Sequence, residues 1–131
     1  MLQIRGIDHV VLRVSNIDVM RRFYCDVLGA EHVAWRPKLR LSHLRAGGCM
    51  IDLVVSDARR EGCNMDHFCL RIEPFDAAAI LAHLRRHGVA LGEVRQRFGA
   101  EGNGVSIYLT DPEGNTVELK GPSDGQPPPK A

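Results

Sequence analysis

The chain lacks both a long apolar run and a secretion signal. None of its apolar stretches approaches the roughly 20 residues that a membrane-spanning helix needs. The N-terminal segment 1–5 also lacks the apolar core of a signal peptide. We therefore expect a cytoplasmic protein with no membrane partner.

Neither sign of charge predominates, and the cysteines lack a motif spacing. The 131 residues include 17 Lys and Arg against 16 Asp and Glu. No run of basic residues occurs, which argues against nucleic acid as a partner. The four cysteines contain no C-x-x-C pair, which argues against a zinc ribbon or a thioredoxin-like motif. In the cytoplasm we expect these cysteines to be reduced.

The length and composition fit one globular domain. With 44% hydrophobic and 25% charged residues, the chain is ordinary for a soluble globular protein. It is also long enough to bury a core without disulfides. We expect a single domain over residues 1–121. The segment 122–131 is rich in proline and has no periodicity, so we expect a flexible tail there.

Two short stretches of the chain are copies of each other. Residues 8–14 read DHVVLRV and residues 66–72 read DHFCLRI, so each copy has a histidine at its second position. Each copy is followed by a helical pattern that a glycine closes, Gly29 in the first case and Gly88 in the second. A repeat of this length is typical of one supersecondary unit used twice.

Each copy begins a module with the same order of elements. The β-branched and apolar residues of 7–14 predict a strand, and Ser15 with Asp18 resembles a helix-capping box. An apolar helical stripe follows at positions 20, 23, 24, 27 and 28. The other predicted elements are, in order, strands near 32–36, 39–45 and 49–55, a strand over 65–72, a helix over 75–87, and strands near 92–97, 104–110 and 116–120. The sequence thus predicts an α+β fold of two β-α-β-β-β modules, about 5–55 and 65–121.

Histidines and carboxylates fall at equivalent points of the two modules. The repeat aligns His9 with His67, and alignment of the last strands places Asp52 on Glu118. A carboxylate within an apolar strand is costly to bury unless it is paired, hydrogen-bonded or bound to a metal. Two imidazoles with one or two carboxylates suit Fe²⁺, Mn²⁺, Ni²⁺, Co²⁺ or Zn²⁺.

Structural roles stay open as alternatives to metal binding. A strand histidine is often a hydrogen-bonded core residue, and Cys69, on the same face as His67, has the character of a small core thiol. The other four histidines lie in polar segments and are expected at the surface: His32, His43, His83 and His87.

Four motifs carry a resemblance to a known family. They read IDHVVL over 7–12, FYCDVLG over 23–29, DHFCL over 66–70 and YLTDPEGNTVEL over 108–119. With them the chain resembles the vicinal oxygen chelate superfamily, which includes glyoxalase I, extradiol dioxygenases, fosfomycin-resistance thiol transferases and bleomycin-binding proteins. The resemblance runs from Ile7 to about Gly121. It implies paired β-α-β-β-β modules that form a cup-shaped mixed sheet around a divalent metal.

The resemblance also implies a set of site residues. His9, His67 and Glu118 match the family's metal ligands, and Asp52 stands where glyoxalase I-like members have a glutamate ligand. Tyr108 matches a tyrosine that extradiol dioxygenases use. Short single-chain members are commonly homodimers. The resemblance therefore implies a homodimer with shared active sites and one divalent metal per site: Ni, Zn, Co, Mn or Fe.

Three functions are consistent with these residues. The first is a glyoxalase-like lyase or isomerase that acts on a small carbonyl or vicinal-oxygen substrate, with Glu118 as catalytic base, Asp52 as second carboxylate and Tyr108 in the same site. The alternative enzyme is a non-haem Fe(II) extradiol-type dioxygenase. The third alternative is a non-catalytic small-molecule-binding or drug-resistance protein.

Overall fold

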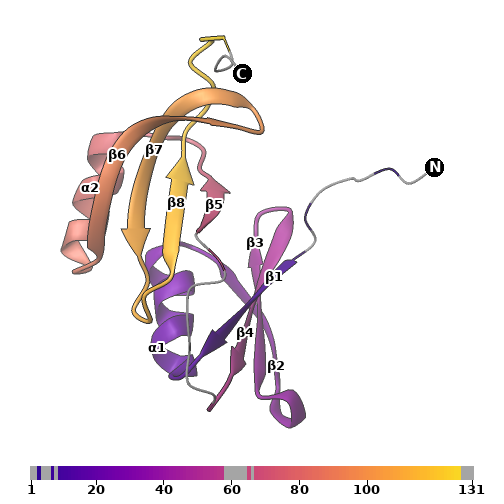
Figure 1. Ribbon diagram of the computed structural model, residues 1–131. Helices are drawn as coiled ribbons and strands as arrows, with labels where there is room; N and C mark the ends of the chain where they lie inside the picture. Colours follow the sequence, from indigo (N-terminus) through magenta and orange to yellow (C-terminus); the bar gives the residue numbers. More distant parts are fainter. Residues whose placement is uncertain (1–2, 4–6, 8, 58–64, 66, 128–131) are drawn as a thin grey trace. The chain divides into compact units, whose positions relative to one another are not determined.

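The chain divides into two compact units, which are described separately. The computed structural model describes residues 3, 7, 9–57, 65 and 67–127. Asp8 and Asp66, the first residues of the two repeated motifs, lie outside these described residues. Unit 1 comprises Met1–Glu61 and unit 2 comprises Gly62–Ala131. Each unit contains its own sheet and its own helix (Figure 1).

Unit 1 contains a four-stranded mixed sheet. Its elements are β1 (His9–Val14), α1 (Ile17–Arg22), the π-helical turn η1 (Phe23–Val27), β2 (Glu31–Arg36), the 3-10 turn η2 (Pro37–Leu39), β3 (Leu41–Ala46) and β4 (Cys49–Val55). The strand order is β1-β4-β3-β2. β1 runs parallel to β4, and the other neighbours are antiparallel. The last strand of the unit therefore lies between the first strand and β3.

The helix of unit 1 is capped one residue later than the capping-box pattern predicts. The side chain of Asn16, and not that of Ser15, accepts a hydrogen bond from the Val19 N–H at 3.1 Å. Asparagine is as good an N-cap as serine, and Asn16 directly precedes the first helical residue. Gly29 follows the helical segment with φ of +84°, in agreement with its predicted role as the closing residue.

Unit 2 repeats the order of elements found in unit 1. It contains β5 (Phe68–Arg71), α2 (Ala77–Arg86), β6 (Ala90–Gly99), β7 (Gly102–Thr110) and β8 (Thr116–Lys120). The strand order is β5-β8-β7-β6, with β5 parallel to β8 and the other neighbours antiparallel. Asp76 caps α2, because its side chain accepts a hydrogen bond from the Ala79 N–H at 3.0 Å. Gly88 follows the helix with φ of +66°.

The connection between β7 and β8 is the tight turn that the sequence predicts over residues 111–115. Asp111 is buried, and its Oδ1 accepts hydrogen bonds from the N–H groups of Glu113 and Asn115 at 2.9 and 2.8 Å. Gly114 in this turn has φ of +86°, which favours glycine. The turn sets the register in which β8 pairs with β7.

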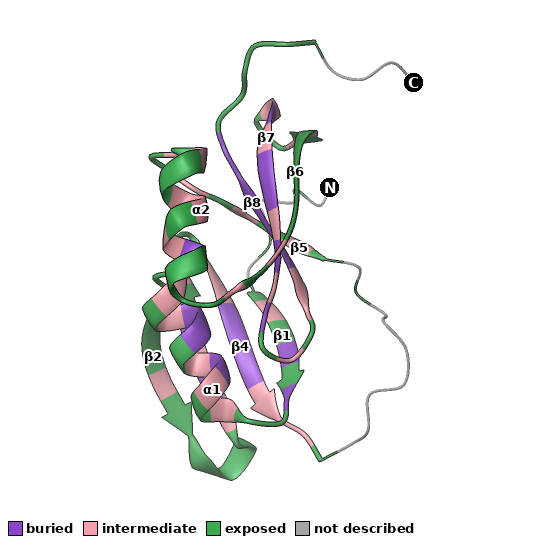
Figure 2. Ribbon diagram, turned by 90° about the vertical axis from the view of Figure 1, so that its left-hand side faces the viewer, coloured by how far each residue is buried: buried purple, intermediate pink, exposed green. Residues whose placement is uncertain are grey.

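Each sheet has an apolar face and a polar face. Figure 2 shows buried residues along β4, and along β7 and β8. The apolar faces carry leucine, isoleucine and valine side chains such as Leu12, Leu44 and Leu53 in unit 1 and Ile107, Val117 and Leu119 in unit 2. Successive strand residues alternate between faces. The polar face of unit 1 therefore carries His9, His43 and Asp52, and the polar face of unit 2 carries Ser106, Tyr108 and Glu118.

The predicted fold class is confirmed. The chain is α+β, and each unit is a β-α-β-β-β module with a four-stranded mixed sheet. The single domain over 1–121 and the flexible tail over 122–131 stay predictions. In the described part of the chain, no helix is both long enough and apolar enough to cross a membrane.

Candidate functional site

Glu118 is a buried carboxylate in the middle of β8. Its side chain is 7% exposed. His67, which directly precedes β5, places Nε2 3.1 Å from Oε2 of Glu118. Ser106 on β7 donates a hydrogen bond from Oγ to Oε1 of the same carboxylate at 2.5 Å. Unit 2 thus brings together two of the residues predicted as metal ligands.

The register of the sheet explains why these side chains meet. Cys69 on β5 pairs with Glu118, and His67 lies two residues before Cys69. Tyr108 on β7 is the cross-strand partner of Glu118, and Ser106 lies two residues before Tyr108. Residues two apart on a strand share a face. His67 and Ser106 therefore lie diagonally across from Glu118 on its two neighbouring strands, within reach of its carboxylate.

Asp52 has a partner that the repeat does not predict. Its side chain is 10% exposed, and its Oδ1 lies 2.8 Å from Nδ1 of His43 on β3. The expectation that His43 is a surface residue is therefore wrong: its side chain is only 29% exposed and is paired with a buried carboxylate. The β3–β4 turn at Gly47-Gly48 makes His43 and Asp52 cross-strand partners. Counting outwards from that turn in the sequence would have found the pair.

His9 holds the same place in unit 1 that His67 holds in unit 2. Val11 on β1 pairs with Asp52, and His9 lies two residues earlier on the same strand and face. Among the described residues, no group of three or more His, Cys, Asp and Glu side chains is arranged to hold a metal ion. The predicted roles of His9, Asp52, His67 and Glu118 as metal ligands therefore stay predictions.

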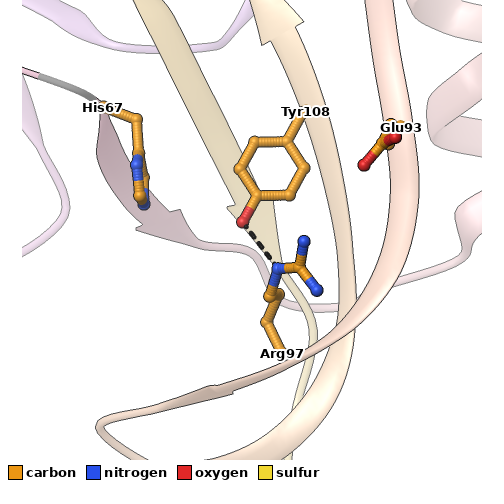
Figure 3. Close-up of a pocket in the computed structure, with 4 residues that line it drawn as sticks. All are labelled: His67, Glu93, Arg97 and Tyr108. Carbon is orange, nitrogen blue, oxygen red and sulfur yellow. Dashed lines mark hydrogen bonds between the residues drawn. The ribbon is translucent and has the colours of Figure 1, made fainter.

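A small pocket lies beside His67 in unit 2. It has a volume of about 380 Å³ and is lined by His67, Glu93, Arg97 and Tyr108 (Figure 3). The Tyr108 ring meets the His67 ring nearly edge-on, with 5.8 Å between their centroids. Arg97 donates a hydrogen bond from Nε to the Tyr108 hydroxyl at 3.1 Å, and its guanidinium carbon lies 5.7 Å from the centre of the tyrosine ring.

Sequence reasoning found His67 and Tyr108 but missed the two residues that β6 contributes to this pocket. Glu93, Arg95 and Arg97 alternate along β6, and Arg95 pairs with Ser106 on the polar face. Three charged residues at alternate positions of a predicted strand were the available signal, because such spacing puts their side chains on one face. β6 lies outside the two repeated motifs, which are the stronger signal in the sequence.

The thiol of Cys69 lies next to Glu118 and stays protonated at neutral pH. Cys69 is an exposed residue and not the core thiol that we expected. Partial burial of its sulfur, and next the negative charge of Glu118, raise the pKa of Cys69 to about 11. Since the thiolate is the reactive form of cysteine, this side chain is a poor nucleophile in the structure as it stands.

Known proteins resemble this chain over nearly its whole length. The sequence profile of the Glyoxalase/Bleomycin resistance protein/Dioxygenase superfamily matches residues 6–119. Virulence protein STM3117 of Salmonella typhimurium is 31% identical over 120 residues, which span 86% of this chain and 81% of that protein. Its crystal structure superposes with a TM-score of 0.76 over 92% of this chain and 99% of the other.

Two further solved structures share the fold. An integron cassette protein from the mobile metagenome of V. cholerae has a TM-score of 0.76 and 26% identity, over 92% of this chain and 98% of that protein. The fosfomycin resistance protein FosX of Listeria monocytogenes has a TM-score of 0.74 over 93% of this chain and 97% of its own, and at 21% identity it is a likeness of fold. The chain belongs to the Glyoxalase/Bleomycin resistance protein/Dioxygenase superfamily, also called the vicinal oxygen chelate superfamily.

Proposed function

We propose that this protein is a divalent-metal-dependent, glyoxalase-like lyase or isomerase that acts on a small carbonyl or vicinal-oxygen substrate. The observation that carries the proposal is the approach of His67 Nε2 to Glu118 Oε2, 3.1 Å apart. Glu118 is buried, and burial of a carboxylate is costly unless a positive charge or a set of hydrogen bonds compensates it.

The donor set fits a divalent metal. Nitrogen and oxygen ligands lie about 2.0–2.2 Å from such an ion, so two ligands at a right angle are about 3 Å apart. The spacing of His67 Nε2 and Glu118 Oε2 matches that value. A metal needs further ligands, and we expect His9 to be one of them, with Asp52 as a weaker fourth candidate. When bound, the metal would supply Lewis-acid stabilisation of a developing oxyanion on the substrate.

The residues around Glu118 suit proton transfer next to a carbonyl. The carboxylate of Glu118 is the candidate base, and a positioned base of this kind contributes about 10²–10⁴-fold to the rate. The Ser106 hydroxyl, which donates to Oε1, fixes the orientation of the carboxylate. Tyr108 borders the adjoining pocket, where its hydroxyl is held by Arg97 and is placed to contact a bound substrate.

One observation favours an extradiol-type dioxygenase as the second candidate. The Tyr108 ring lies against the proposed ligand His67, at 5.8 Å between centroids. A phenol hydroxyl close to a metal ligand is able to hydrogen-bond an oxygen of a bound diol. Against this candidate, extradiol-type members usually have a histidine acid–base at the position where this chain has Asp52, and Asp52 is paired with His43.

The family also contains dimers, and a homodimer with shared sites is part of this proposal. In that arrangement His9 of one subunit would join His67 and Glu118 of its partner at each of two equivalent sites. A closed twofold interface produces two such sites from one surface patch. The arrangement explains how short chains with two half-sites each could form complete ligand sets.

The test is metal analysis of protein purified without a histidine tag, for the wild type and for His9→Ala, His67→Ala and Glu118→Gln. We expect one divalent ion per site in the wild type and a large loss in every variant, with the far-ultraviolet circular dichroism spectrum unchanged. Unchanged metal content in any two of the variants would refute the assignment.

The same preparations separate the candidate reactions. Nickel, zinc or cobalt together with turnover of a carbonyl substrate supports the lyase or isomerase. Iron with uptake of dioxygen in the presence of a catechol supports the dioxygenase. A full complement of metal with no turnover over a broad panel of carbonyl compounds and catechols instead indicates a binding protein.

A further inference from the structure

We propose that the substrate carries a carboxylate, and that Arg97 binds it at the end of the pocket away from Glu118. This inference rests on the proposed function, because it takes the His67–Glu118 end as the place where the reacting oxygens bind. It adds the class of substrate, a small oxo or hydroxy acid anion, and the residue that selects it. Its basis is the distribution of charge within unit 2.

The negative charge of Glu93 in the pocket is already matched. Arg95 approaches both oxygens of this carboxylate, with Nε at 2.7 Å from one and Nη2 at 2.9 Å from the other. The hydrogen bond from Arg95 and its positive charge lower the pKa of Glu93, so this side chain stays ionised and paired at neutral pH. Glu93 and Arg95 together therefore contribute little net charge to the pocket.

Arg97 forms no hydrogen bond or ion pair with a carboxylate among the described residues, although its charge adds to that of Arg95 in lowering the pKa of Glu93. Its Nε donates to the Tyr108 hydroxyl, and one terminal nitrogen donates to the Gln96 carbonyl at 3.3 Å. Both acceptors are neutral. A guanidinium has five N–H donors, so the remaining donors of Arg97 are available to a ligand. A guanidinium also matches the planar geometry of a carboxylate with two parallel hydrogen bonds.

The other carboxylates of this part of unit 2 have partners too. Glu118 is bonded by His67 and Ser106, and Glu101 in the β6–β7 turn forms an ion pair with Arg71 on β5. Lys120, two residues after Glu118, has a buried ammonium group with no hydrogen-bond partner among the described residues. The cations Arg97 and Lys120, counted against the carboxylate of Glu118, leave a surplus of one positive charge on this face of unit 2.

Arg97 and not Lys120 is the cation that a ligand reaches. A Cβ atom at Gly99 would lie 2.7 Å from Cε of Lys120, and one at Gly104 would lie 3.0 Å from its Nζ. The glycines of the β6–β7 hairpin thus allow the backbone to close over the ammonium group. Arg97 instead lines the pocket, where Tyr108 lies between it and His67 (Figure 3). A small molecule along Tyr108 would place its two ends at Arg97 and at the His67–Glu118 pair.

The first experiment needs no metal. Succinate and its uncharged diamide are titrated into metal-free protein, and binding is followed by the NMR signal of the Arg97 side-chain Nε–H. We expect succinate to bind about tenfold to a hundredfold more tightly than the diamide, as a charge-assisted pair of hydrogen bonds implies. Arg97→Gln should abolish the difference, measured on backbone signals of β7, and Arg97→Lys should restore part of it.

The matched control is Arg86→Gln, which removes the same charge from the exposed end of α2. It should leave the preference for succinate intact. A purely structural effect of Arg97→Gln would weaken both probes equally and keep their ratio. A ratio near one in the wild type, a ratio kept in Arg97→Gln, or an equal loss in Arg86→Gln would each overturn the inference.

The second experiment uses metal-loaded protein and separates this inference from the proposed function. The probes are the monohydroxamate of succinic acid and the same molecule with a carboxamide in place of its carboxylate. Binding of both hydroxamates with equal affinity supports the metal site and overturns the role of Arg97. If no metal binds, the proposed function fails, and the succinate preference of the metal-free protein still decides the inference.

Discussion

The two units hold a carboxylate at the same point of the same fold but give it different partners. Asp52 on β4 and Glu118 on β8 each lie between a parallel and an antiparallel neighbour. The antiparallel neighbour of β4 is β3, which places His43 opposite Asp52. The antiparallel neighbour of β8 is β7, which places Tyr108 opposite Glu118. His43 Nδ1 lies 2.8 Å from Oδ1 of Asp52. The Tyr108 hydroxyl does not bond Glu118 in this way and accepts a hydrogen bond from Arg97.

The duplicated module therefore gives its two carboxylates different surroundings. In unit 2 the carboxylate of Glu118 is paired with His67 and Ser106, and His67 borders the pocket. In unit 1 the histidine at the equivalent position supplies an internal partner for Asp52. The side chain of Asp52 is also one methylene shorter than that of Glu118, so it reaches less far toward a shared ion. We therefore expect the two carboxylates to differ in their contribution to metal binding.

The largest expected effect is the contrast between Glu118→Gln and Asp52→Asn. Glu118→Gln should weaken metal binding by more than about 100-fold, since it would remove a proposed ligand and not only a group that orients one. Asp52→Asn should weaken binding by less than about tenfold. Competition titration with a chromophoric chelator measures both values.

His43→Ala sharpens the same contrast. This substitution leaves the buried Asp52 without its partner, so it should lower the free energy of unfolding of the metal-free protein by about 1–3 kcal/mol. It should leave the stoichiometry of metal binding unchanged. If Asp52→Asn loses metal as completely as Glu118→Gln, Asp52 is a full ligand and the two units are functionally symmetric.

A smaller effect is expected from Ser106→Ala. The hydroxyl of Ser106 is fully buried and donates to Oε1 of Glu118, so its removal leaves that oxygen without the donor that orients it. Loss of such a contact to a metal ligand typically weakens metal affinity by about 10–100-fold. The matched control is Ser42→Ala in unit 1, because the buried Ser42 hydroxyl has no hydrogen-bond partner among the described residues. Equal effects of the two serine variants on metal affinity would show that Ser106 does not act through Glu118.

The sequence predicted the elements well because their signals are local. Gly29 and Gly88 close the two helical segments at positive φ, and Asp111 organises the turn before β8, as their patterns indicate. Repeat alignment placed Asp52 and Glu118 at equivalent register positions, which the sheets confirm. The helix ends and the turn depend on residues within a few positions of each other, whereas the equivalence of Asp52 and Glu118 comes from the repeat.

The side-chain partners were harder to predict because they depend on register between strands. The polar segment around His43 predicts a surface residue, because nothing next to it in sequence indicates that Asp52 lies opposite. The same holds for Arg97. What places it at the pocket is its hydrogen bond to the Tyr108 hydroxyl, and that contact depends on the pairing of β6 with β7. A strand pattern gives the face of a residue, but pairing decides which side chain it meets there.

The last prediction asks whether unit 1 of one chain works with unit 2 of another. In the proposed homodimer, a His9→Ala chain keeps an intact unit 2 and a Glu118→Gln chain keeps an intact unit 1. Each variant alone should bind almost no metal. If the two are unfolded together and refolded, about half of the dimers are mixed, and each mixed dimer holds one doubly altered site and one intact site. Metal binding should then return to roughly a quarter of the wild-type level, a fourfold deficit.

Mass spectrometry under native conditions confirms that subunits have exchanged. Exchange without any recovery would place the whole ligand set within one chain, because both kinds of site in a mixed dimer would then carry one substitution each.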